Sequence, residues 1–561
     1  RYPSFPKAFS EGRVQNIILT NKKLDMKQIF TLFFALATIS FSFSQSSEIK
    51  LRKEVGQTIA SPVNADVNIQ PRSINCIWEN DFSDASAWSL EVDVPANQSP
   101  MWEICTSPNE LVCEGPAPIE TINSANGYYA MVDSDEFGGS TSLGYMEDSW
   151  LTMVNPVNLS DYENVIVEFD THYRSWSNEK CFIVVSTDGN FPNNLTATSE
   201  EDPEAGIYEV FPTFGQGDMT DNPTTVRINI TEAAAGESQV WIRFNWAGEW
   251  GYAWFIDRVC IAEQPNDDVE LSYGAVSFNN TAYEYGRTPV SQLGTDIAVS
   301  CAAYNFGVNE QDNVSLSMVV TDASDYEVAS TSDFTTEIYN ETLADYEAVS
   351  GTMENDAVWY FTGSIPSLGA GTYKATFTVT SDGESDGETF SNNIAVREFA
   401  ISDDLYSTDG IGVYSESDLN SYGPGSFGAE SNDGFMMFSY YDMPNGSNIE
   451  AVEIMLDVNN TVAGGEFLVH LLDTTVLFSS ETVTSDMIAD QIKQSSDFYL
   501  VTEADIANGF ITVPMDGAWL PSGGGYLVGV EMYSNEGTVP MRILDDQTIP
   551  QPGSMAMIFI P

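Results

Sequence analysis

Apolar and polar side chains alternate with a period of two along most of the chain. The pattern is clearest in five stretches: 165–170, 314–320, 373–380, 452–458 and 526–532. Successive side chains of a β-strand point to opposite faces, so this alternation predicts half-buried strands, and the Asn/Asp/Gly/Ser/Pro clusters between them predict turns. Helical periodicity is scarce, with 484–493 as the best short candidate. The pattern therefore predicts an all-β protein made of antiparallel sheets.

The strand pattern falls into three blocks. A chain of 561 residues is too long for a single core. Residues 71–264 hold nine of the eleven tryptophans and five of the six cysteines, whereas 265–400 and 401–561 contain one tryptophan each. We therefore expect tandem β-sandwiches, one in each block. The third block ends without a closing turn, so we expect it to be truncated.

The N-terminal segment predicts export. Residues 26–44, "MKQIFTLFFALATISFSFS", combine one lysine with an apolar run and small residues, which is typical of a signal peptide. Residues 1–25 precede this start and are interpreted as non-native or upstream sequence, and 45–70 as a polar linker. No later apolar run is long enough to suggest membrane insertion. We expect a secreted or outer-surface protein.

The charge of the chain restricts its partners. Lys and Arg number 20 against 83 Asp and Glu, a formal net charge of −63. Such a surface repels nucleic-acid phosphates and anionic membranes, so we expect neither as a partner. It suits a protein that stays soluble in salt or that gathers divalent cations.

The cysteines of an exported chain can form disulfides. Cys105 and Cys113 enclose a short loop and are the first expected pair. Cys76 and Cys260 lie in the first and last strands of the same block, which are often neighbours in a closed sandwich, so they form a plausible second pair. The two remaining cysteines lie in apolar patterns and are expected to be buried thiols: Cys181 and Cys301.

Candidate catalytic residues are few. The two histidines lie in separate blocks: His172 is expected to be solvated or hydrogen-bonded at a sheet surface, and His470 to face the other surface of its own sheet. The sequence contains no nucleophile elbow, zinc-protease helix or phosphate-binding glycine loop. Glu168 and Asp170 share one strand face, but a glycosidase requires two opposed acids. We therefore expect no enzyme activity, with a glycosidase centred on Glu168 as the weaker alternative.

Calcium is the metal that the acidic residues favour, because Ca²⁺ takes six to eight oxygen ligands. Three stretches of the first block supply carboxylates, and convergence of its first and last strands would bring them together. Ordinary turn acids are the alternative interpretation. The candidate ligands are Glu79, Asp81, Asp133 and Asp257.

The stretch 241–254 contains four tryptophans. Alternation places Trp246 on the core face and Trp241 on a face flanked by polar residues. Large rings of this kind either close the end of a sandwich core or stack on sugars. The candidate ligand-binding rings are Trp176, Trp250 and Tyr252.

Five ordered motifs carry a resemblance over about 75–263: "IWENDFSDASAW", "GYYAMVDSDEFGG", "DSWLTMVNPVNLSDYENVIVEFDTHYR", "CFIVVSTDG" and "WGYAWFIDRVCI". They resemble the MAM-like or cleaved-adhesin (choice-of-anchor J type) jelly rolls of Bacteroidota, which are associated with type IX secretion. The resemblance implies a calcium-stabilised, non-catalytic sandwich used in adhesion. The family often has an acid where this chain has Arg258, which weakens the metal assignment.

The second block is similar to bacterial cell-adhesion-related immunoglobulin-like modules, on "TDIAVSCAAYNFG" (295–307) and "SNN" (391–393). Together the two resemblances imply a jelly roll, an Ig-like sandwich and a third β-sandwich. We expect a non-catalytic adhesin that binds a glycan or a surface protein. The alternative is the accessory region of a secreted peptidase or glycoside hydrolase.

Overall fold

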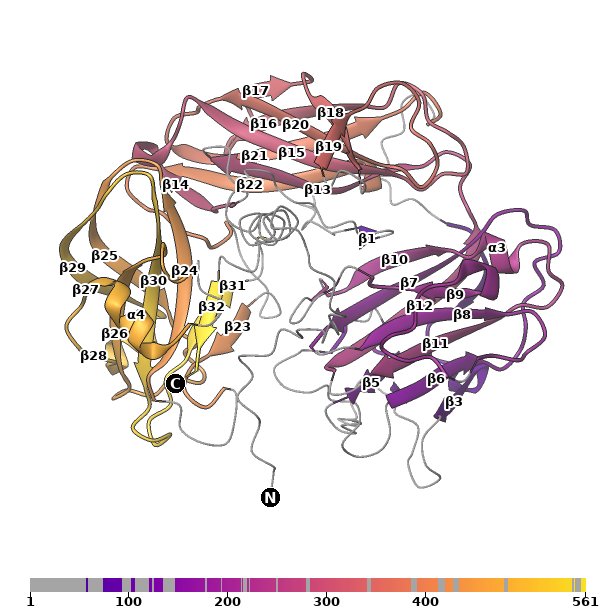
Figure 1. Ribbon diagram of the computed structural model, residues 1–561, viewed down its shortest axis with the longest axis horizontal. Helices are drawn as coiled ribbons and strands as arrows, with labels where there is room; N and C mark the ends of the chain where they lie inside the picture. The colour runs from indigo at the N-terminus through magenta and orange to yellow at the C-terminus, as the bar shows by residue number, and fades with distance from the viewer. Residues whose placement is uncertain are drawn as a thin grey trace, which may run out of the picture.

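A computed structural model shows three β-sandwiches that follow one another around an arc (Figure 1). Almost all sheet pairs are antiparallel and helices are short, which confirms the predicted all-β fold of tandem sandwiches. The structure describes residues 57–58, 74–92, 102–105, 121–123, 126–134, 147–176, 179–192, 194–212, 214, 219–220, 222–248, 251–278, 283–340, 345–384, 391–411, 419–426, 433–478, 483–546, 549 and 556–560.

The first sandwich pairs a seven-stranded with a five-stranded sheet. The seven-stranded sheet runs in the order β1 (Gln57–Thr58), β10 (Thr224–Asn229), β7 (Val165–Arg174), β12 (Ala253–Glu263), β5 (Tyr129–Asp133) and β4 (Trp102–Cys105), with β2 (Cys76–Asn80) also on β12. The five-stranded sheet runs β3 (Trp88–Val92), β6 (Glu147–Met153), β11 (Trp241–Gly248), β8 (Lys180–Ser186) and β9 (Ile207–Glu209). Strand β1 lies within the segment predicted to be a linker.

The second sandwich has two five-stranded sheets. One runs β13 (Val269–Phe278), β15 (Asp296–Asn305), β20 (Val358–Pro366), β18 (Thr335–Asn340) and β19 (Asp345–Ala348). The other runs β14 (Arg287–Pro289), β22 (Ile394–Ser402), β21 (Gly371–Thr380), β16 (Ser315–Asp322) and β17 (Glu327–Thr331). Strand β14 pairs with β22 in parallel.

The third sandwich is less regular. Its large sheet runs β27 (Ile492–Ser495), β26 (Glu466–Asp473), β30 (Gly524–Tyr533), β24 (Phe435–Met443) and β32 (Ala556–Phe559), with β28 (Tyr499–Leu500) also on β26. Two strand pairs complete it: β25 (Ser447–Met455) with β29 (Phe510–Leu520), and β23 (Leu419–Tyr422) with β31 (Ile543–Asp546).

Helices are short throughout the described residues. The α-helices are α3 (Thr231–Ala234), α4 (Ser485–Gln491) and α5 (Glu503–Asn508). The 3₁₀ turns are η1 (Ala85–Ala87), η2 (Pro203–Ala205), η3 (Val290–Gln292) and η4 (Ser391–Asn393). Helix α4 confirms the single helical expectation, and its N-cap Thr484 accepts a hydrogen bond from the Met487 amide. No described helix is long and apolar enough to cross a bilayer.

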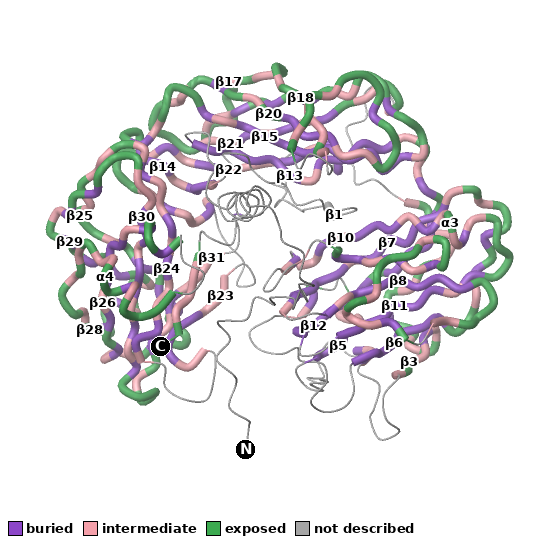
Figure 2. Tube along the Cα trace, viewed as in Figure 1, coloured by how far each residue is buried: buried purple, intermediate pink, exposed green. Residues whose placement is uncertain are grey.

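Aromatic side chains fill the core of the first sandwich. Phe244 of β11 packs against Phe169 of β7 and Trp254 of β12, with ring centroids 5.1 and 5.8 Å away. Trp246 and Trp254 are both fully buried, so these two rings are core residues. In all three sandwiches, buried residues follow the strands and exposed residues lie on the outer loops (Figure 2).

Strand β7 is buried on both of its faces because the second sandwich covers part of it. Val165, Val167 and Phe169 belong to the intersheet core, whereas Ile166 packs in a separate apolar cluster with Tyr304 and Phe306 of the second sandwich. The second and third sandwiches meet through Tyr285, whose hydroxyl accepts a hydrogen bond from the Asp442 amide at 2.8 Å. Both joints therefore bury apolar and polar groups together.

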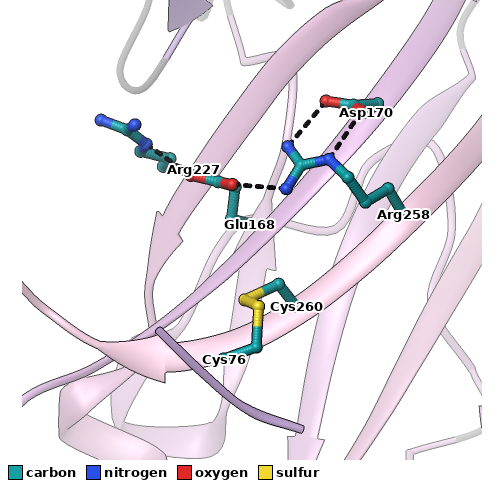
Figure 3. The surroundings of a disulfide bond; sticks show 6 residues. All are labelled: Cys76, Glu168, Asp170, Arg227, Arg258 and Cys260. Carbon is teal, nitrogen blue, oxygen red and sulfur yellow. Dashed lines mark hydrogen bonds and ion pairs between the residues drawn. A yellow bond between two sulfur atoms is a disulfide. The ribbon is translucent and has the colours of Figure 1, made fainter. Parts of the chain in front are cut away.

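A disulfide closes the first sandwich. Cys76 of β2 bonds to Cys260 of β12, which confirms the pairing suggested by first and last strands (Figure 3). Cys105 is also disulfide-bonded, but its expected partner, Cys113, lies outside the described residues. Cys181 and Cys301 are buried thiols, as predicted.

We predict that replacing both Cys76 and Cys260 with serine lowers the free energy of unfolding by about 2–5 kcal/mol, because the cross-link encloses a long loop. Chemical denaturation without reductant measures the change. Cys301→Ser is the control, since it alters a buried thiol without breaking a cross-link, and it should cost less. An unchanged midpoint in the double variant would contradict the stabilising role.

Candidate functional site

Glu168 lies at the centre of a buried ionic network next to the disulfide (Figure 3). It pairs in register with Cys260 across β7 and β12. Its Oε1 accepts a hydrogen bond from Arg258 Nη1 and its Oε2 accepts one from Arg227 Nε, both at 2.9 Å. Each carboxylate oxygen is therefore bound by a guanidinium. The proposed glycosidase role of Glu168 would require an acid free to reach a substrate, and this carboxylate is held by two cations instead.

Arg258 reaches Glu168 because β12 bulges at this point. The residue has a φ of 44°, and the register of β12 with β7 shifts between Asp257 and Cys260. The guanidinium then lies over β7 and donates two hydrogen bonds to Asp170, at 2.8 and 3.0 Å. Hydrogen bonding to Asp170 is the largest cause of the raised pKa of Arg258. The arginine at this position thus has a structural role.

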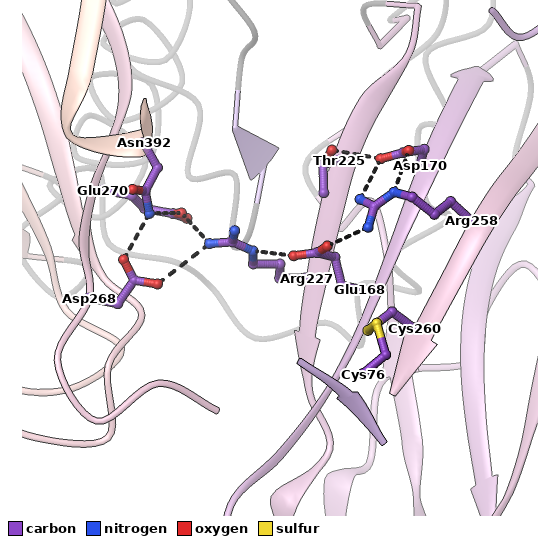
Figure 4. Close-up of polar contacts among 10 residues, drawn as sticks. All are labelled: Cys76, Glu168, Asp170, Thr225, Arg227, Arg258, Cys260, Asp268, Glu270 and Asn392. Atoms are coloured by element: carbon purple, nitrogen blue, oxygen red, sulfur yellow. Dashed lines mark hydrogen bonds and ion pairs between the residues drawn. A yellow bond between two sulfur atoms is a disulfide. The ribbon is translucent and has the colours of Figure 1, made fainter. Parts of the chain in front are cut away.

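Arg227 extends the network into the second sandwich (Figure 4). Its Nη1 lies 3.0 Å from Glu270 Oε2 and 3.5 Å from Asp268 Oδ2, and its guanidinium carbon lies 5.3 Å from the centroid of the Phe306 ring. Burial lowers the pKa of Arg227, but Glu270, Glu168 and Asp268 outweigh that effect and raise it. Asp268 is completely buried and accepts a hydrogen bond from Asn392 Nδ2 at 2.8 Å. The network is a structural joint between two domains.

His172 is buried, contrary to the prediction of a solvated sheet face. Only 3% of it is exposed. Its ring stacks on Phe255 at 5.9 Å, and its Nδ1 lies 3.4 Å from Thr220 Oγ1. The prediction was wrong because an apolar cluster that includes Tyr252 and Met131 covers this outer face.

Two of the three predicted ligand-binding rings lie together, around an arginine. Trp176 and Tyr252 are 5.8 Å apart, and the guanidinium of Arg174 lies 4.7 Å from the Tyr252 ring and 5.8 Å from the Trp176 ring. Tyr252 is buried and Trp176 half-buried. The third ring, Trp250, lies outside the described residues. Both described rings therefore already contact a cation of the protein itself.

The predicted calcium ligands are spread along β12 and along the two strands that pair with one side of it, β5 and β2. Asp133 pairs with Ala253, and Asp257 lies four residues further along β12, which corresponds to about 13 Å of strand. Glu79, an exposed residue, pairs with Cys260, and Asp81 follows at the end of β2. No group of three or more potential metal ligands occurs among the described residues. The calcium site stays a prediction.

Asp81 and Asp257 each already bind protein donors. Asp81 Oδ1 accepts hydrogen bonds from the Ser83 amide and hydroxyl, and Oδ2 accepts one from Asn126 Nδ2. The Ser83 hydroxyl is the largest cause of the lowered pKa of Asp81. Asp257 Oδ1 accepts a hydrogen bond from the Arg258 amide at 2.7 Å. These contacts are typical of acids that stabilise turns and bulges.

A groove of about 330 Å³ crosses the five-stranded sheet on its outer face. Strand β3 contributes Ser89 and Glu91, β6 contributes Thr152, and β11 contributes Trp241 and Arg243. The residues after β8 add Gly189 and Phe191, and Met153 and Val154 at the end of β6 complete the lining. Trp241 is half-buried and lies close to Gly189, which has a φ of 79°. The groove therefore combines an indole ring with polar side chains.

Arg243 forms the fixed floor of this groove. Its guanidinium lies 4.2 Å from the Trp150 ring and 4.1 Å from the Phe191 ring. Its Nε donates to Thr152 Oγ1 at 3.2 Å and its Nη1 to the Pro192 carbonyl at 2.9 Å, whereas Nη2 has no partner among the described residues. Burial lowers the pKa of Arg243 to about 10, so it remains charged at neutral pH.

A smaller cavity of about 210 Å³ lies near Tyr173, Glu179 and Cys181. Burial raises the pKa of the Cys181 thiol well above its usual range, and the reactive form of cysteine is the thiolate. The Tyr173 hydroxyl donates to Glu179 Oε1 at 3.3 Å. Burial therefore leaves the Cys181 thiol in its unreactive, protonated form.

The sequence did not reveal the groove, because ligand-binding rings were expected in exposed loops. Alternation did place Trp241 and Arg243 on the face opposite the core. It could not show that β3 and β6 lie beside β11, since strand order depends on long-range pairing. Glu91 and Thr152 reach the same surface only through that order.

Comparisons with known proteins establish no family. No protein-family model and no curated protein matches the chain. Among solved structures, it is similar to the K1 cleaved-adhesin domain of Lys-gingipain from Porphyromonas gingivalis W83, with 14% identity and a TM-score of 0.21 over 33% of this chain and 97% of that one.

Two similar glycoside hydrolases are much longer than the matched part of this chain. The Endo-D glycoside hydrolase domain from Streptococcus pneumoniae R6 has 10% identity and a TM-score of 0.20, over 56% of this chain and 38% of that one. A family 2 glycosyl hydrolase from Bacteroides cellulosilyticus DSM 14838 has 11% identity and a TM-score of 0.23, over 45% and 28%. These likenesses are too weak to carry function over to this chain.

We predict that Arg227→Met destabilises the protein by about 3–5 kcal/mol, because it leaves Glu168, Asp268 and Glu270 buried without their shared cation. Chemical denaturation measures the loss, and small-angle scattering should show a wider spread of interdomain angles. The control is Lys374→Met, which removes a more exposed pair with Asp325 and should cost less than about 1 kcal/mol. Equal effects of the two variants would refute a special role for Arg227.

Proposed function

We propose that the chain is a ligand-binding β-sandwich protein whose first sandwich is non-catalytic and binds glycans through the Trp241–Arg243 groove. The observation that carries the proposal is the juxtaposition of an indole ring, a rigidly held guanidinium and an exposed carboxylate, Glu91, along one open groove. Small-ligand sites combine an apolar surface with a few placed polar groups in this way.

The chemistry of the groove favours a sugar over the other ligand classes considered. A pyranose ring has an apolar face that can stack on Trp241, and hydroxyls that both donate and accept hydrogen bonds. Arg243 offers only donors and Glu91 only acceptors, while the hydroxyls of Ser89 and Thr152 can do either. The strongly acidic surface of the chain disfavours polyanions such as nucleic acids. A neutral glycan satisfies these requirements.

The location that fits this function is the outside of the cell. The Cys76–Cys260 disulfide indicates an oxidising compartment. Together with the predicted signal peptide, this supports an exported protein that contacts a glycan, or a glycan-bearing surface protein, in the way an adhesin does. Anchoring and secretion by the type IX route remain expectations from the family resemblance.

We predict that Trp241→Ala and Arg243→Met each weaken glycan binding at least about tenfold, equivalent to about 1.4 kcal/mol. A glycan array with the intact protein identifies the ligand, and titration calorimetry measures the loss. Trp519→Ala is the matched control, since this tryptophan is 65% exposed in the third sandwich. If array binding survives both groove variants, or depends on Trp519, the proposed site is wrong.

Calcium stabilisation of the first sandwich is a separate part of the proposal. If Ca²⁺ binds the folded chain, it should raise the free energy of unfolding by about 2.7 kcal/mol at a hundred times its Kd. Thermal melting of the intact protein in calcium and in EDTA measures the shift, and an Asp81→Asn, Asp257→Asn double variant should abolish it. Identical melting curves in calcium and EDTA would remove calcium from the proposal.

A further inference from the structure

The third sandwich brings a serine, a histidine and a glutamate into one hydrogen-bonded line. His470 of β26 pairs with Ser495 of the neighbouring β27, and Glu531 projects from β30 on the other side of β26. Ser495 Oγ lies 2.7 Å from His470 Nδ1, and Glu531 Oε2 lies 2.8 Å from His470 Nε2. A nucleophile, a base and an acid that orients the base form this chain of contacts in serine hydrolases.

The side chains of this hydrogen-bonded line differ in solvent exposure, as a reactive serine requires. His470 is only 5% exposed, whereas Ser495 is exposed to solvent. The second oxygen of Glu531 accepts a hydrogen bond from the Tyr533 hydroxyl at 2.6 Å. The hydrogen bond with His470 is the largest cause of the lowered pKa of Glu531, so the carboxylate is ionised at neutral pH. The base is therefore buried and fixed, while the hydroxyl beside it is accessible.

We propose that Ser495 is a nucleophile that accepts acyl groups from carboxylic esters, with His470 as its general base and Glu531 as the residue that positions His470. Ser495 Oγ attacks the ester carbonyl carbon while its proton passes to His470 Nδ1. The tetrahedral adduct then expels the alcohol, which takes that proton. Water then attacks the acyl-serine as its proton passes to His470. The second adduct breaks its bond to Ser495 Oγ, which takes the proton back from His470 as the carboxylic acid leaves.

The two ring nitrogens of His470 exchange the roles that they have in the usual serine hydrolase triad. The serine lies at Nδ1 and the acid at Nε2, so the reaction requires the tautomer with its proton on Nε2. Ionised Glu531 favours this tautomer because it accepts a hydrogen bond from Nε2, and it stabilises the imidazolium that forms during the attack. Either ring nitrogen of a neutral imidazole can accept a proton.

Exposed apolar side chains in the segment that follows Ser495 indicate the class of ester. Phe498 is 63% and Leu500 55% exposed. The Phe498 ring centroid lies 6.0 Å from that of Tyr533, which binds Glu531. An apolar acyl chain lying over these residues would remove exposed apolar surface from water. The substrate class is thus an ester with an apolar acyl group, and the site is independent of the glycan groove in the first sandwich.

The test uses the intact protein and two activated donors, a fluorophosphonate probe and p-nitrophenyl butyrate. Intact-protein and peptide mass spectrometry should show one phosphonyl group on Ser495, and release of p-nitrophenol should follow the same site. Ser495→Ala should abolish both signals. Glu531→Gln should slow labelling at least tenfold, and Glu531→Asp should restore part of the rate, since a merely structural acid would not control it.

The control variant is Ser485→Ala, which removes an exposed serine of the same sandwich, at the start of α4, and should label at the rate of the unmodified protein. Melting temperatures of all variants establish that each is folded. Absence of labelling at Ser495 in the folded protein overturns the proposal. Labelling that persists at full rate in Glu531→Gln, or in heat-unfolded protein, shows ordinary solvent reactivity and overturns it equally.

Discussion

One buried guanidinium, that of Arg227, determines how the first two sandwiches fit together. Apolar contacts such as Ile166 against Phe306 bring the domains together, but they are non-directional and would tolerate a range of angles. Charged hydrogen bonds are directional. Glu168 from one sandwich and Glu270 from the next both bond to Arg227, and this is possible only when β10 and β13 approach in one orientation.

Basic residues are scarce in this chain, and several of its arginines serve internal contacts. Arg174, Arg227 and Arg243 are each at least nine-tenths buried, and each lies over an aromatic ring. Arg258 neutralises two acids of β7. Because these cations serve internal contacts, few basic side chains remain for the outer surface. That surface stays acidic, which favours solubility and repulsion of anionic surfaces.

Local patterns predicted the strands well, because alternation of side chains is a local property. They placed Val167 and Phe169 in the core and Trp246 on the inner face of β11, and they identified α4. They could not reveal which strands lie side by side. Three features depend on residues far apart in sequence: the burial of His172, the pairing of Glu168 with Arg227, and the groove around Arg243. Their partners could not be predicted before the fold was known.

The Cys76–Cys260 cross-link has a consequence for the order in which the first sandwich is assembled. The two cysteines are 184 residues apart, and β12 is the last strand of its sandwich to leave the ribosome. Cys76 therefore meets its native partner only after all the intervening chain has been made, including the thiol of Cys181. The native cross-link can form only after β12 has paired with β2, so it fixes strands that have already come together.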